Sequence, residues 1–477
     1  MLKGLEINVI NINDIDNIQY RLDSEYYSKQ NIALEQQIKN YGYHTLEELG
    51  AKLDCSAFYP SITDDYNFTK QGIPFIRVNE IQNGLILITD STAFLPETII
   101  DKNSNTIAKA YPGDIVIAKG GNTLAKTGIL TNEYPVYAIC RDVILIRVND
   151  ISSNLRYCIW AFLHSKLGYN LMLRSASQTG QPHLTLPNIL KLTIPSWSNE
   201  FAKLIDNCYN RSVVLNEETA KLYSEAENIL LKNLRLEDWK PKMQLTTEKT
   251  FADFLTSGRL DAEYYQPKYD QIERDISQYA NGYSTIQELF DIKDKNFTPK
   301  NNVKYKYIEL SNIGSSGEVM GCTEELGIDL PSRARRVVKT GDIIVSSIEG
   351  SLKSCAIVTA EYNNAICSTG FFVLTPKTIN SQTALILFKS EPIQQLLKKT
   401  CSGTILPAMN KDEFLSIKLP IISTEIQQQI LDKIEKSFAL RTESKHLLSL
   451  AKVAVETAIE LGEDKAIELL NDIKLCL

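Results

Sequence analysis

"RLDSEYY" at residues 21–27 and "RLDAEYY" at residues 259–265 differ at a single position. The two copies lie half a chain apart in a sequence of 477 residues. A repeat with so long a period does not indicate a solenoid and predicts a duplicated domain. The arginine, the acidic residues and the paired tyrosines form a compact group. Packing inside each domain is its favoured role, and docking of a partner is the alternative.

Five further blocks recur in the same order in both halves of the chain. They are YGYHTLEELG (41–50) with NGYSTIQELF (281–290), IPFIRVNEIQNG (73–84) with YKYIELSNIGSSG (305–317), GDIVIAKGGNTLAKTGIL (113–130) with GDIIVSSIEGSLKSCAIV (341–358), YAIC (137–140) with NAIC (364–367), and SQTGQPHLTLPNILKLTIP (177–195) with CSGTILPAMNKDEFLSIKLP (401–420). Chance would not preserve this order, so the two halves are predicted to share one fold.

Each half reads as mixed α and β. The segments FIRV, YIEL, GDIVIA and GDIIVS are short apolar strand candidates bounded by turn residues. Residues 155–174 and 383–400 have helical spacing, and Pro392 is expected to divide the second of these stretches. The sequence therefore predicts an α/β domain in each half.

A long helix is predicted at the end of each half. Its apolar or small positions follow a 4-3-4-3 spacing, as in a coiled coil. They are Phe201, Ile205, Cys208, Ser212, Leu215, Thr219, Leu222, Ala226 and Ile229 in the first, and Ile426, Ile430, Lys433, Ser437, Leu440, Ser444, Leu447, Ala451, Ala454, Ala458 and Leu461 in the second. Pairing of the two helices is favoured, and separate packing of each helix on its own domain is the alternative.

Composition and missing motifs argue against several functions. Nine scattered cysteines without a C-x-x-C pair favour a reducing cytoplasm, and no apolar run is long enough for a membrane span. The four histidines lack metal-ligand spacing, and no phosphate-binding loop or nucleophile elbow occurs. We therefore expect no catalytic metal site. The net charge of −7 neither indicates nor excludes a nucleic acid, because a local patch decides such binding.

The ordered blocks resemble the specificity subunit of type I restriction-modification systems. The marks are the repeated G-D-I-[IV] strand with its polar loop, and the TGQPHLTLPNILKLTIP block that leads into a long helix. The second half departs from this pattern with LPAMN at residues 406–410. The resemblance implies two pseudo-repeated α/β target-recognition domains, separated by two long helices that form an antiparallel coiled coil.

The implied boundaries are residues 1–199 for the first target-recognition domain and 200–248 for the first spacer helix and linker. Residues 249–421 would form the second such domain, and 422–477 the second spacer helix with a C-terminal helix. The resemblance implies a cytoplasmic, non-catalytic subunit without a cofactor of its own.

The implied partners are double-stranded DNA, two methyltransferase subunits that use S-adenosylmethionine, and translocase-endonuclease subunits that use ATP and Mg²⁺. The alternative is a scaffold subunit of a related phage-defence assembly in which DNA reading is secondary.

Candidate DNA contacts come from the polar residues of the matched loops. Arg, Lys, Asn and Gln suit base edges and phosphates, and Glu can accept from a cytosine amino group. In the first half they are Arg77, Asn79, Lys119, Asn122, Thr123, Lys126, Gln178, Gln181 and His183. In the second half they are Ser311, Asn312, Arg333, Arg335, Arg336, Ser346, Glu349, Ser351, Lys353, Ser402, Thr404 and Asn410. The three arginines are expected to hold phosphates.

Overall fold

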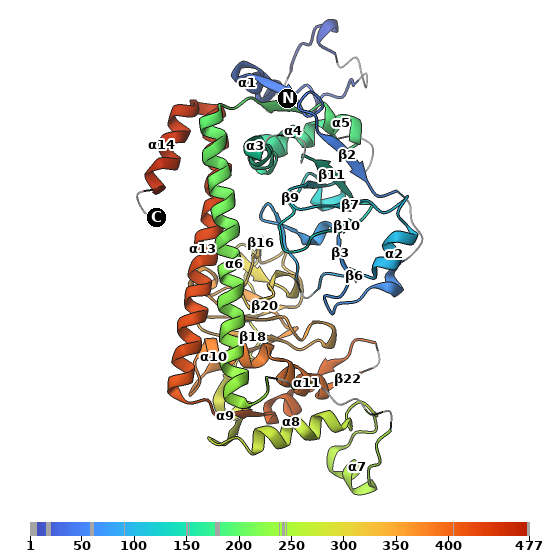
Figure 1. Cartoon of the computed structure of the whole chain (residues 1–477), viewed down its shortest axis with the longest axis vertical. Helices are drawn as coiled ribbons and strands as arrows, with labels where there is room; N and C mark the ends of the chain where they lie inside the picture. The colour runs from blue at the N-terminus through green and yellow to red at the C-terminus, as the bar shows by residue number, and fades with distance from the viewer. Residues whose placement is uncertain are drawn as a thin grey trace. The chain divides into compact units, whose positions relative to one another are not determined.

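The computed structural model describes residues 7–15, 21–57, 62–89, 91–148, 151, 153–176, 182–237, 239–240, 244, 246–403 and 405–474 (Figure 1). Its contacts divide the chain into two compact units. Unit 1 comprises Met1–Ile88, Thr92–Asn216 and Thr442–Leu477, and unit 2 comprises Thr89–Ser91 and Glu217–Arg441. Each unit thus contains one copy of the repeated sequence.

Unit 1 is built on two β-sheets. Its strands are β2 (Lys52–Cys55), β3 (Ile73–Ile76), β4 (Ile81–Gln82), β5 (Leu85–Ile86), β6 (Phe94–Leu95), β7 (Lys109–Ala110), β8 (Ile115–Ala118), β9 (Thr127–Ile129), β10 (Tyr137–Ile139) and β11 (Val143–Arg147), with β1 (Tyr43–Thr45) and β12 (Thr193–Pro195) as a separate pair. The sheet orders are β2-β11-β8-β9-β5-β4 and β6-β3-β10-β7. The helices are α1 (Lys29–Tyr41), α2 (Glu97–Lys102), α3 (Ser153–His164), α4 (Lys166–Ser175) and α5 (Leu186–Leu190).

Unit 2 repeats this plan. Its strands are β13 (Tyr283–Thr285), β14 (Phe290–Ile292), β15 (Lys304–Ile308), β16 (Thr323–Leu326), β17 (Ala334–Val337), β18 (Ile343–Ser346), β19 (Cys355–Ile357), β20 (Ile366–Ser368), β21 (Phe371–Pro376), β22 (Cys401–Ser402), β23 (Ala408–Met409) and β24 (Lys418–Pro420). Its helices are α7 (Phe251–Ser257), α8 (Pro267–Ser277), α9 (Ile286–Leu289), α10 (Ser381–Lys389), α11 (Glu391–Lys399) and α12 (Lys411–Ser416).

The two units share one strand order. In unit 2, β14-β21-β18-β19 follows the same path as β2-β11-β8-β9, and β16-β15-β20-β17 follows β6-β3-β10-β7. The register agrees as well, because Ile115 pairs with Ile129 in unit 1 and Ile343 pairs with Ile357 in unit 2. The prediction of one mixed α/β fold used twice is confirmed.

One of the matched sequence blocks is shifted by a residue in the structure. The sequence sets Cys140 against Cys367. The ladders instead place Ile139 beside Ile76 and Cys367 beside Ile308, which hold equivalent positions at the ends of β3 and β15. Ile139 is therefore the counterpart of Cys367. The sequence alone does not indicate this shift, because both the matched AIC sequences and the shifted alignment place an apolar residue in the sheet.

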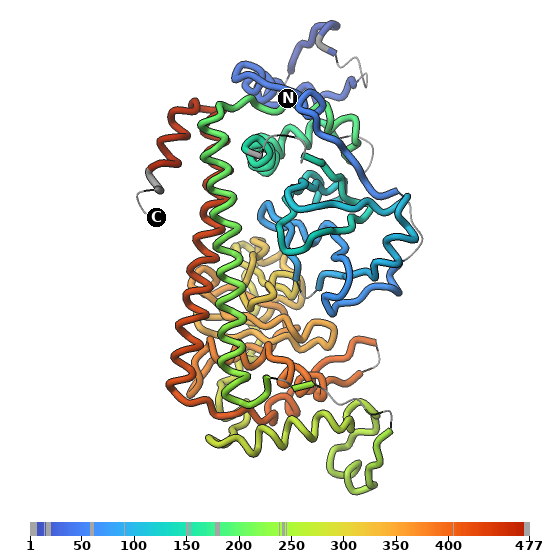
Figure 2. The backbone as a smooth tube through the Cα atoms, in the orientation of Figure 1, coloured from blue at the N-terminus to red at the C-terminus, as the bar shows by residue number. Residues whose placement is uncertain are grey.

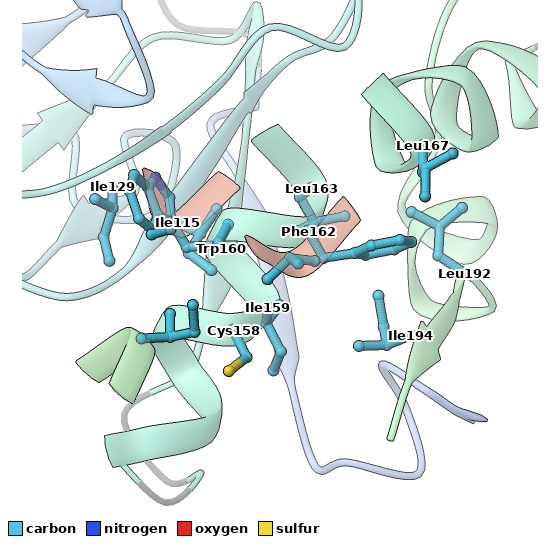
Figure 3. Close-up of a cluster of buried hydrophobic side chains, with 14 of the residues drawn as sticks. Ile115, Ile129, Cys158, Ile159, Trp160, Phe162, Leu163, Leu167, Leu192 and Ile194 are labelled. Carbon is cyan, nitrogen blue, oxygen red and sulfur yellow. The ribbon is translucent and has the colours of Figure 1, made fainter. Parts of the chain in front are cut away.

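One hydrophobic core of unit 1 lies between the larger sheet and the helices that follow it. All four residues of β8 are buried, as their continuous apolar run predicts for a strand covered on both faces. Trp160 is fully buried, and its Nε1–H donates to the carbonyl oxygen of Gly84 at 2.6 Å. Figure 3 shows side chains of this cluster, which include Ile115, Ile129, Cys158, Ile159, Phe162, Leu163, Leu167, Leu192 and Ile194.

The predicted helical stretch of residues 155–174 is divided into α3 and α4. Ser165 separates them, and its Oγ accepts from the Gly168 N–H at 3.1 Å as an N-cap. The equivalent stretch in unit 2 is divided between α10 and α11, and Pro392 lies in the first turn of α11. The division at the proline was predicted, whereas the break at Ser165 was not, because a serine is compatible with a helix interior.

The two long helices, α6 (Asn199–Leu234) and α13 (Thr424–Leu461), lie side by side and antiparallel within each unit (Figure 2). In unit 2, the hydroxyl of Thr219 donates to the Ser437 carbonyl at 3.3 Å, and the hydroxyl of Ser437 donates to the Thr219 carbonyl at 3.2 Å. In unit 1, Ser444 donates in the same way to a carbonyl of α6. The predicted pairing of the two stripes is confirmed.

Small residues hold the two helices close together. Thr219, Ser437 and Ser444 are buried, so their short side chains let the backbones approach and satisfy carbonyls across the pair. Ion pairs from Lys433 to Glu225 and from Lys436 to Glu218 flank this contact in unit 2. The stripe ends before its predicted last residue, Leu461, which is 71% exposed. The final helix, α14 (Glu463–Lys474), follows it.

The repeated heptapeptide forms the same side-chain structure in both units. In unit 1, Arg21 is buried and contacts both carboxylate oxygens of Asp23, at 2.7 and 3.0 Å. Arg21 therefore helps to hold the pKa of the Asp23 carboxyl below its ordinary value. In unit 2, Arg259 holds Asp261 in the same fork, at 2.7 and 2.8 Å. The favoured role of the heptapeptide, packing inside its own domain, is confirmed.

Substitution of Ser437 by leucine should lower the free energy of unfolding by about 1–3 kcal/mol, because the added bulk must enter a close helix contact. The same change at exposed Ala439, on another face of α13, provides the matched control and should have little effect. Urea unfolding followed by circular dichroism measures both variants. Equal losses at the two positions would contradict the close contact.

The partly buried ring of His164 should make stability depend on pH. Burial, together with the nearby Lys452, lowers the His164 pKa to about 4. Because the unfolded histidine has a pKa of about 6.5, the unfolded chain binds more protons between these values, and stability falls as the pH drops through this window. Replacement by phenylalanine, which can keep the ring stack on Trp160, should weaken that dependence.

Thermal unfolding midpoints measured from pH 7 to pH 4 test this expectation. Replacement of the exposed His446 by glutamine is the control and should leave the pH dependence unchanged. A wild-type protein and a His164→Phe variant with the same pH profile would refute it.

Candidate functional site

A loop follows β8 in unit 1, and its first residue joins separate parts of the chain. The N–H of Lys119 donates to the Asp142 carbonyl at 2.8 Å, and the Lys119 carbonyl accepts from the Leu184 N–H at 2.9 Å. The segment after β10 and the segment before α5 therefore both attach to Lys119. Polar residues that lie far apart in the sequence meet at this point.

A hollow of about 880 Å³ opens at this junction. Its lining residues are Cys55, Ser56, Ala57, Val78, Lys119, Gly120, Gly121, Thr123, Arg141, Asp142 and His183. It brings together Lys119, Thr123 and His183 of the candidate residues. It also includes Arg141, which the sequence analysis missed. The signal for Arg141 was its place directly after the matched YAIC block.

Two cationic side chains, Lys119 and Arg141, lie among the residues that line the hollow. Arg141 is mostly exposed, and its ion pair with Asp142 is long, at 4.0 Å, and open to water. Such an exposed pair contributes little stability, so Arg141 can exchange it for another anion at little cost. With Lys119 and the exposed His183 nearby, the hollow can hold phosphate or carbonyl oxygens.

Arg77 and Asn79, which follow β3, differ in how far their side chains are held by other residues. Both lie at the 3₁₀ helix η3 (Val78–Glu80), where Arg77 forms an ion pair with buried Glu80 at 2.9 Å. The other carboxylate oxygen of Glu80 accepts from the Arg77 N–H at 2.9 Å. Arg77 is thus committed to this turn, whereas Asn79 is exposed.

The remaining candidates of the first loop lie at different depths. Asn122 is exposed on the short helix η4 (Gly121–Thr123), and the Thr123 hydroxyl donates to the Gly120 carbonyl at 3.3 Å. Lys126 is partly buried, which lowers the pKa of its amine, and it does not line the hollow. Gln178 and Gln181 lie outside the described residues.

Unit 2 builds the same junction from other side chains. Ser347 takes the place of Lys119: its N–H donates to the Gly370 carbonyl at 2.8 Å, and its carbonyl accepts from the Met409 N–H at 2.7 Å. The Glu349 N–H also donates to the Pro407 carbonyl at 3.0 Å. The two polar blocks that the sequence treats as separate clusters therefore lie together in both units.

Several candidates of unit 2 are used inside the protein. Ser346 is fully buried, and its hydroxyl lies 2.9 Å from that of Ser351. The side-chain oxygen of Asn312 accepts from the Glu309 N–H, as Glu80 does at the equivalent turn of unit 1. The Asn410 side chain caps α12. These residues were chosen as candidates because they are polar, but their polar atoms form hydrogen bonds within turns and at a helix end.

Other candidates of unit 2 are open to solvent. Ser311, Lys353 and Ser402 are exposed, and Thr404 lies outside the described residues. Glu349, on the short helix η6 (Glu349–Ser351), is partly exposed, and 4.0 Å separates its carboxylate from the Lys398 amine. The candidates of this half therefore include hydroxyls and a carboxylate as well as the cation of Lys353.

The three arginines of the second half lie on or beside β17. Arg333 is exposed and pairs with Glu309 at 3.2 Å. The Nε–H of Arg335 donates to the Ser332 carbonyl, and Arg336 donates to the Asn296 side chain at 2.9 Å. Arg333 has the most open position for a phosphate, and the other two are partly covered.

One backbone contact of the junction pairs a small residue with a large one in both units. The small residue lies on opposite sides of the contact in the two units. Gly120 bridges to His183 in unit 1, and Ile348 bridges to Ala408 at the same place in unit 2. A Cβ on Gly120 would lie 2.3 Å from His183 Nδ1, so a larger residue at position 120 would require the imidazole to move. A small residue therefore faces a large one in each unit, with the order reversed.

Substitution of Gly120 by alanine should displace His183 and weaken the hydrogen bond from the Leu184 N–H to Lys119. Amide hydrogen exchange of Leu184 should become faster. The matched control is Gly350→Ala in unit 2, because Gly350 also has no left-handed backbone requirement and a Cβ there would meet open space. Unchanged exchange at Leu184 would show that the contact does not hold this segment.

Within the described ranges, no helix is long and apolar enough to cross a membrane. The described side chains also contain no group of three or more His, Cys, Asp and Glu residues that could hold a metal ion.

Part of the chain is similar to known proteins. Residues 281–450 match the family described as type I restriction modification DNA specificity domain. The Type I restriction enzyme HindI specificity subunit of Haemophilus influenzae is 29% identical over 138 residues. That match covers 28% of this chain and 27% of the relative, so it spans about a quarter of the relative's length.

Two solved structures are similar over most of the chain. The type I restriction-modification S subunit from M. genitalium has a TM-score of 0.29 at 14% identity and covers 90% of this chain and 95% of that one. The HsdS subunit from Thermoanaerobacter tengcongensis has a TM-score of 0.26 at 13% identity and covers 87% and 97%. Residues 281–450 are thus similar to the type I restriction modification DNA specificity domain, and the first half of the chain repeats the strand order of that region.

Proposed function

We propose that the chain is a non-catalytic DNA sequence-recognition subunit that reads a target in two parts. The duplicated junction carries this proposal. Lys119 and Ser347 tie together the same chain segments with the same backbone hydrogen bonds, yet the side chains around them differ. A constant framework with different polar groups suits two domains that read two different half-targets.

The chemistry of the two junctions supports different base preferences. Lys119, Arg141 and His183 supply donors, which suit phosphates and the acceptor edge of guanine. Glu349 supplies an acceptor, which suits the amino group of cytosine. The net charge of −7 does not exclude this binding, because phosphate binding depends on the local field at the hollow.

The proposal includes partners. Two similar domains in one chain offer two similar surfaces, which suits a pair of identical subunits. We expect these to be methyltransferase subunits that use S-adenosylmethionine, joined by translocase-endonuclease subunits that use ATP and Mg²⁺, in the cytoplasm.

Methylation mapping of the host DNA with and without the gene tests the function directly. A split sequence motif should be methylated only when the gene is present. If the same motifs were methylated in both strains while the assembly still formed, the chain would act as a scaffold.

Replacing Lys119 and Arg141 together by glutamine should remove recognition of one half-target, because each good base contact is worth about 1–3 kcal/mol of discrimination. Co-purification of partner subunits should be unchanged, since both residues lie in the hollow and outside the helix pair. The control exchanges two exposed lysines that do not line the hollow, Lys102 and Lys191, for glutamine. Wild-type methylation by the double variant would exclude these residues from recognition.

A further inference from the structure

The hairpin β22–β23 in unit 2 depends on contacts at its base. Its ladder pairs only Cys401 with Met409 and Ser402 with Ala408. So short a ribbon is not stable alone. Near its tip, Ile405 is 91% exposed, so this apolar side chain does not anchor the hairpin. Whatever holds the first and last residues of this hairpin decides where it lies.

The last residue of the hairpin, Met409, is held by the loop that follows β18. The Met409 N–H donates to the Ser347 carbonyl at 2.7 Å. The first residue, Cys401, is held by the repeated heptapeptide. The Nη2 of Arg259 donates to the Cys401 carbonyl at 2.8 Å. Arg259 also contacts both oxygens of Glu413 on α12 at 3.2 Å, so it joins the hairpin to the helix that follows it.

Contacts within the heptapeptide also fix the orientation of the Arg259 guanidinium. Asp261 accepts from two of its nitrogens, and the Arg259 side chain is only 12% exposed. The ring of Tyr264 lies 4.8 Å from the guanidinium carbon, and the hydroxyl of Tyr265 donates to the Arg259 carbonyl at 2.6 Å. A planar group held in this way points its remaining donors in a set direction.

In unit 1, Arg21 makes the equivalent contacts with backbone carbonyls at the equivalent position. Nη1 of Arg21 donates to the carbonyls of Arg174, in the last turn of α4, and of Ala176, its C-cap, at 3.2 and 2.8 Å. A cation at this end of a helix satisfies carbonyls that lack partners and opposes the negative end of the helix dipole. Tyr26 lies between Arg21 and Arg174, with its ring centroid 4.5 and 4.2 Å from their guanidinium carbons.

The support around each arginine is duplicated too. Glu35 on α1 pairs with Arg174, and Glu273 on α8 pairs with Lys399. Each of these cations stacks on the first tyrosine of its heptapeptide. The structure thus repeats a whole network whose outer carboxylates lie beyond the matched sequence blocks.

We propose that Arg259 and Arg21 are positioning residues for sequence reading, each fixing the polar segment of its own unit through backbone carbonyls without touching DNA. This inference rests on the proposed function. It explains why the heptapeptide is nearly constant while the loops differ: the same anchor serves two different reading surfaces. It also predicts that each arginine controls only one half of the target.

The test uses the full chain in its host assembly, with Arg259→Lys and Arg21→Lys made separately. Lysine keeps the charge, but its single amine cannot hold the aspartate fork and the carbonyl together. Methylation mapping should show about tenfold lower base discrimination at one half-target for Arg259→Lys, and at the other for Arg21→Lys. The control is Arg211→Lys on α6, an exposed arginine outside both anchors, which should leave both halves unchanged.

A base preference that stays at wild-type level in both variants would overturn the proposal. So would an equal loss at both half-targets, because that result would indicate general destabilisation. If the wild type itself directed no sequence-specific methylation, the proposed function would fail instead.

Amide hydrogen exchange of the purified full chain gives an answer that needs no partner. In Arg259→Lys, the Met409 amide should exchange faster while amides of the β18–β21 ladder keep their rates. Unchanged exchange at Met409 would overturn the positioning role.

Discussion

The organisation of each half depends on one backbone position at the end of a buried strand. Lys119 in unit 1 and Ser347 in unit 2 use their amide and carbonyl groups to join two other segments of the chain. Because these are main-chain hydrogen bonds, they do not depend on which side chain is present. The protein can therefore change the chemistry of its polar loops and keep their geometry.

A second constraint acts from outside the loops. The forked arginines hold carbonyls where α4 and α11 give way to the polar segments, and buried helix ends need such partners. The strand-end residue and the arginine thus restrain each polar segment from its two sides. The long helices add their own restraint through Ser437 and Ser444, which satisfy carbonyls of α6 while keeping the contact close.

The sequence predicted the duplicated α/β fold and the helix pair because order and spacing survive divergence. It predicted individual site residues less well. Ser346, Asn312 and Asn410 have the right polarity, but a serine or asparagine that completes a turn has the same letter as one that meets a ligand. Arg141 was missed because its proximity to Lys119 arises from a fold contact across the sheet.

The reversed sizes at Gly120 with His183 and at Ile348 with Ala408 limit how such proteins can diversify. A recombination event that moved only the loop from one half to the other would set glycine against alanine and leave a void, or isoleucine against histidine and create a clash. Both sides of the contact must be inherited together. The unit of exchange between related genes should therefore be a whole domain, with crossovers falling outside the pair.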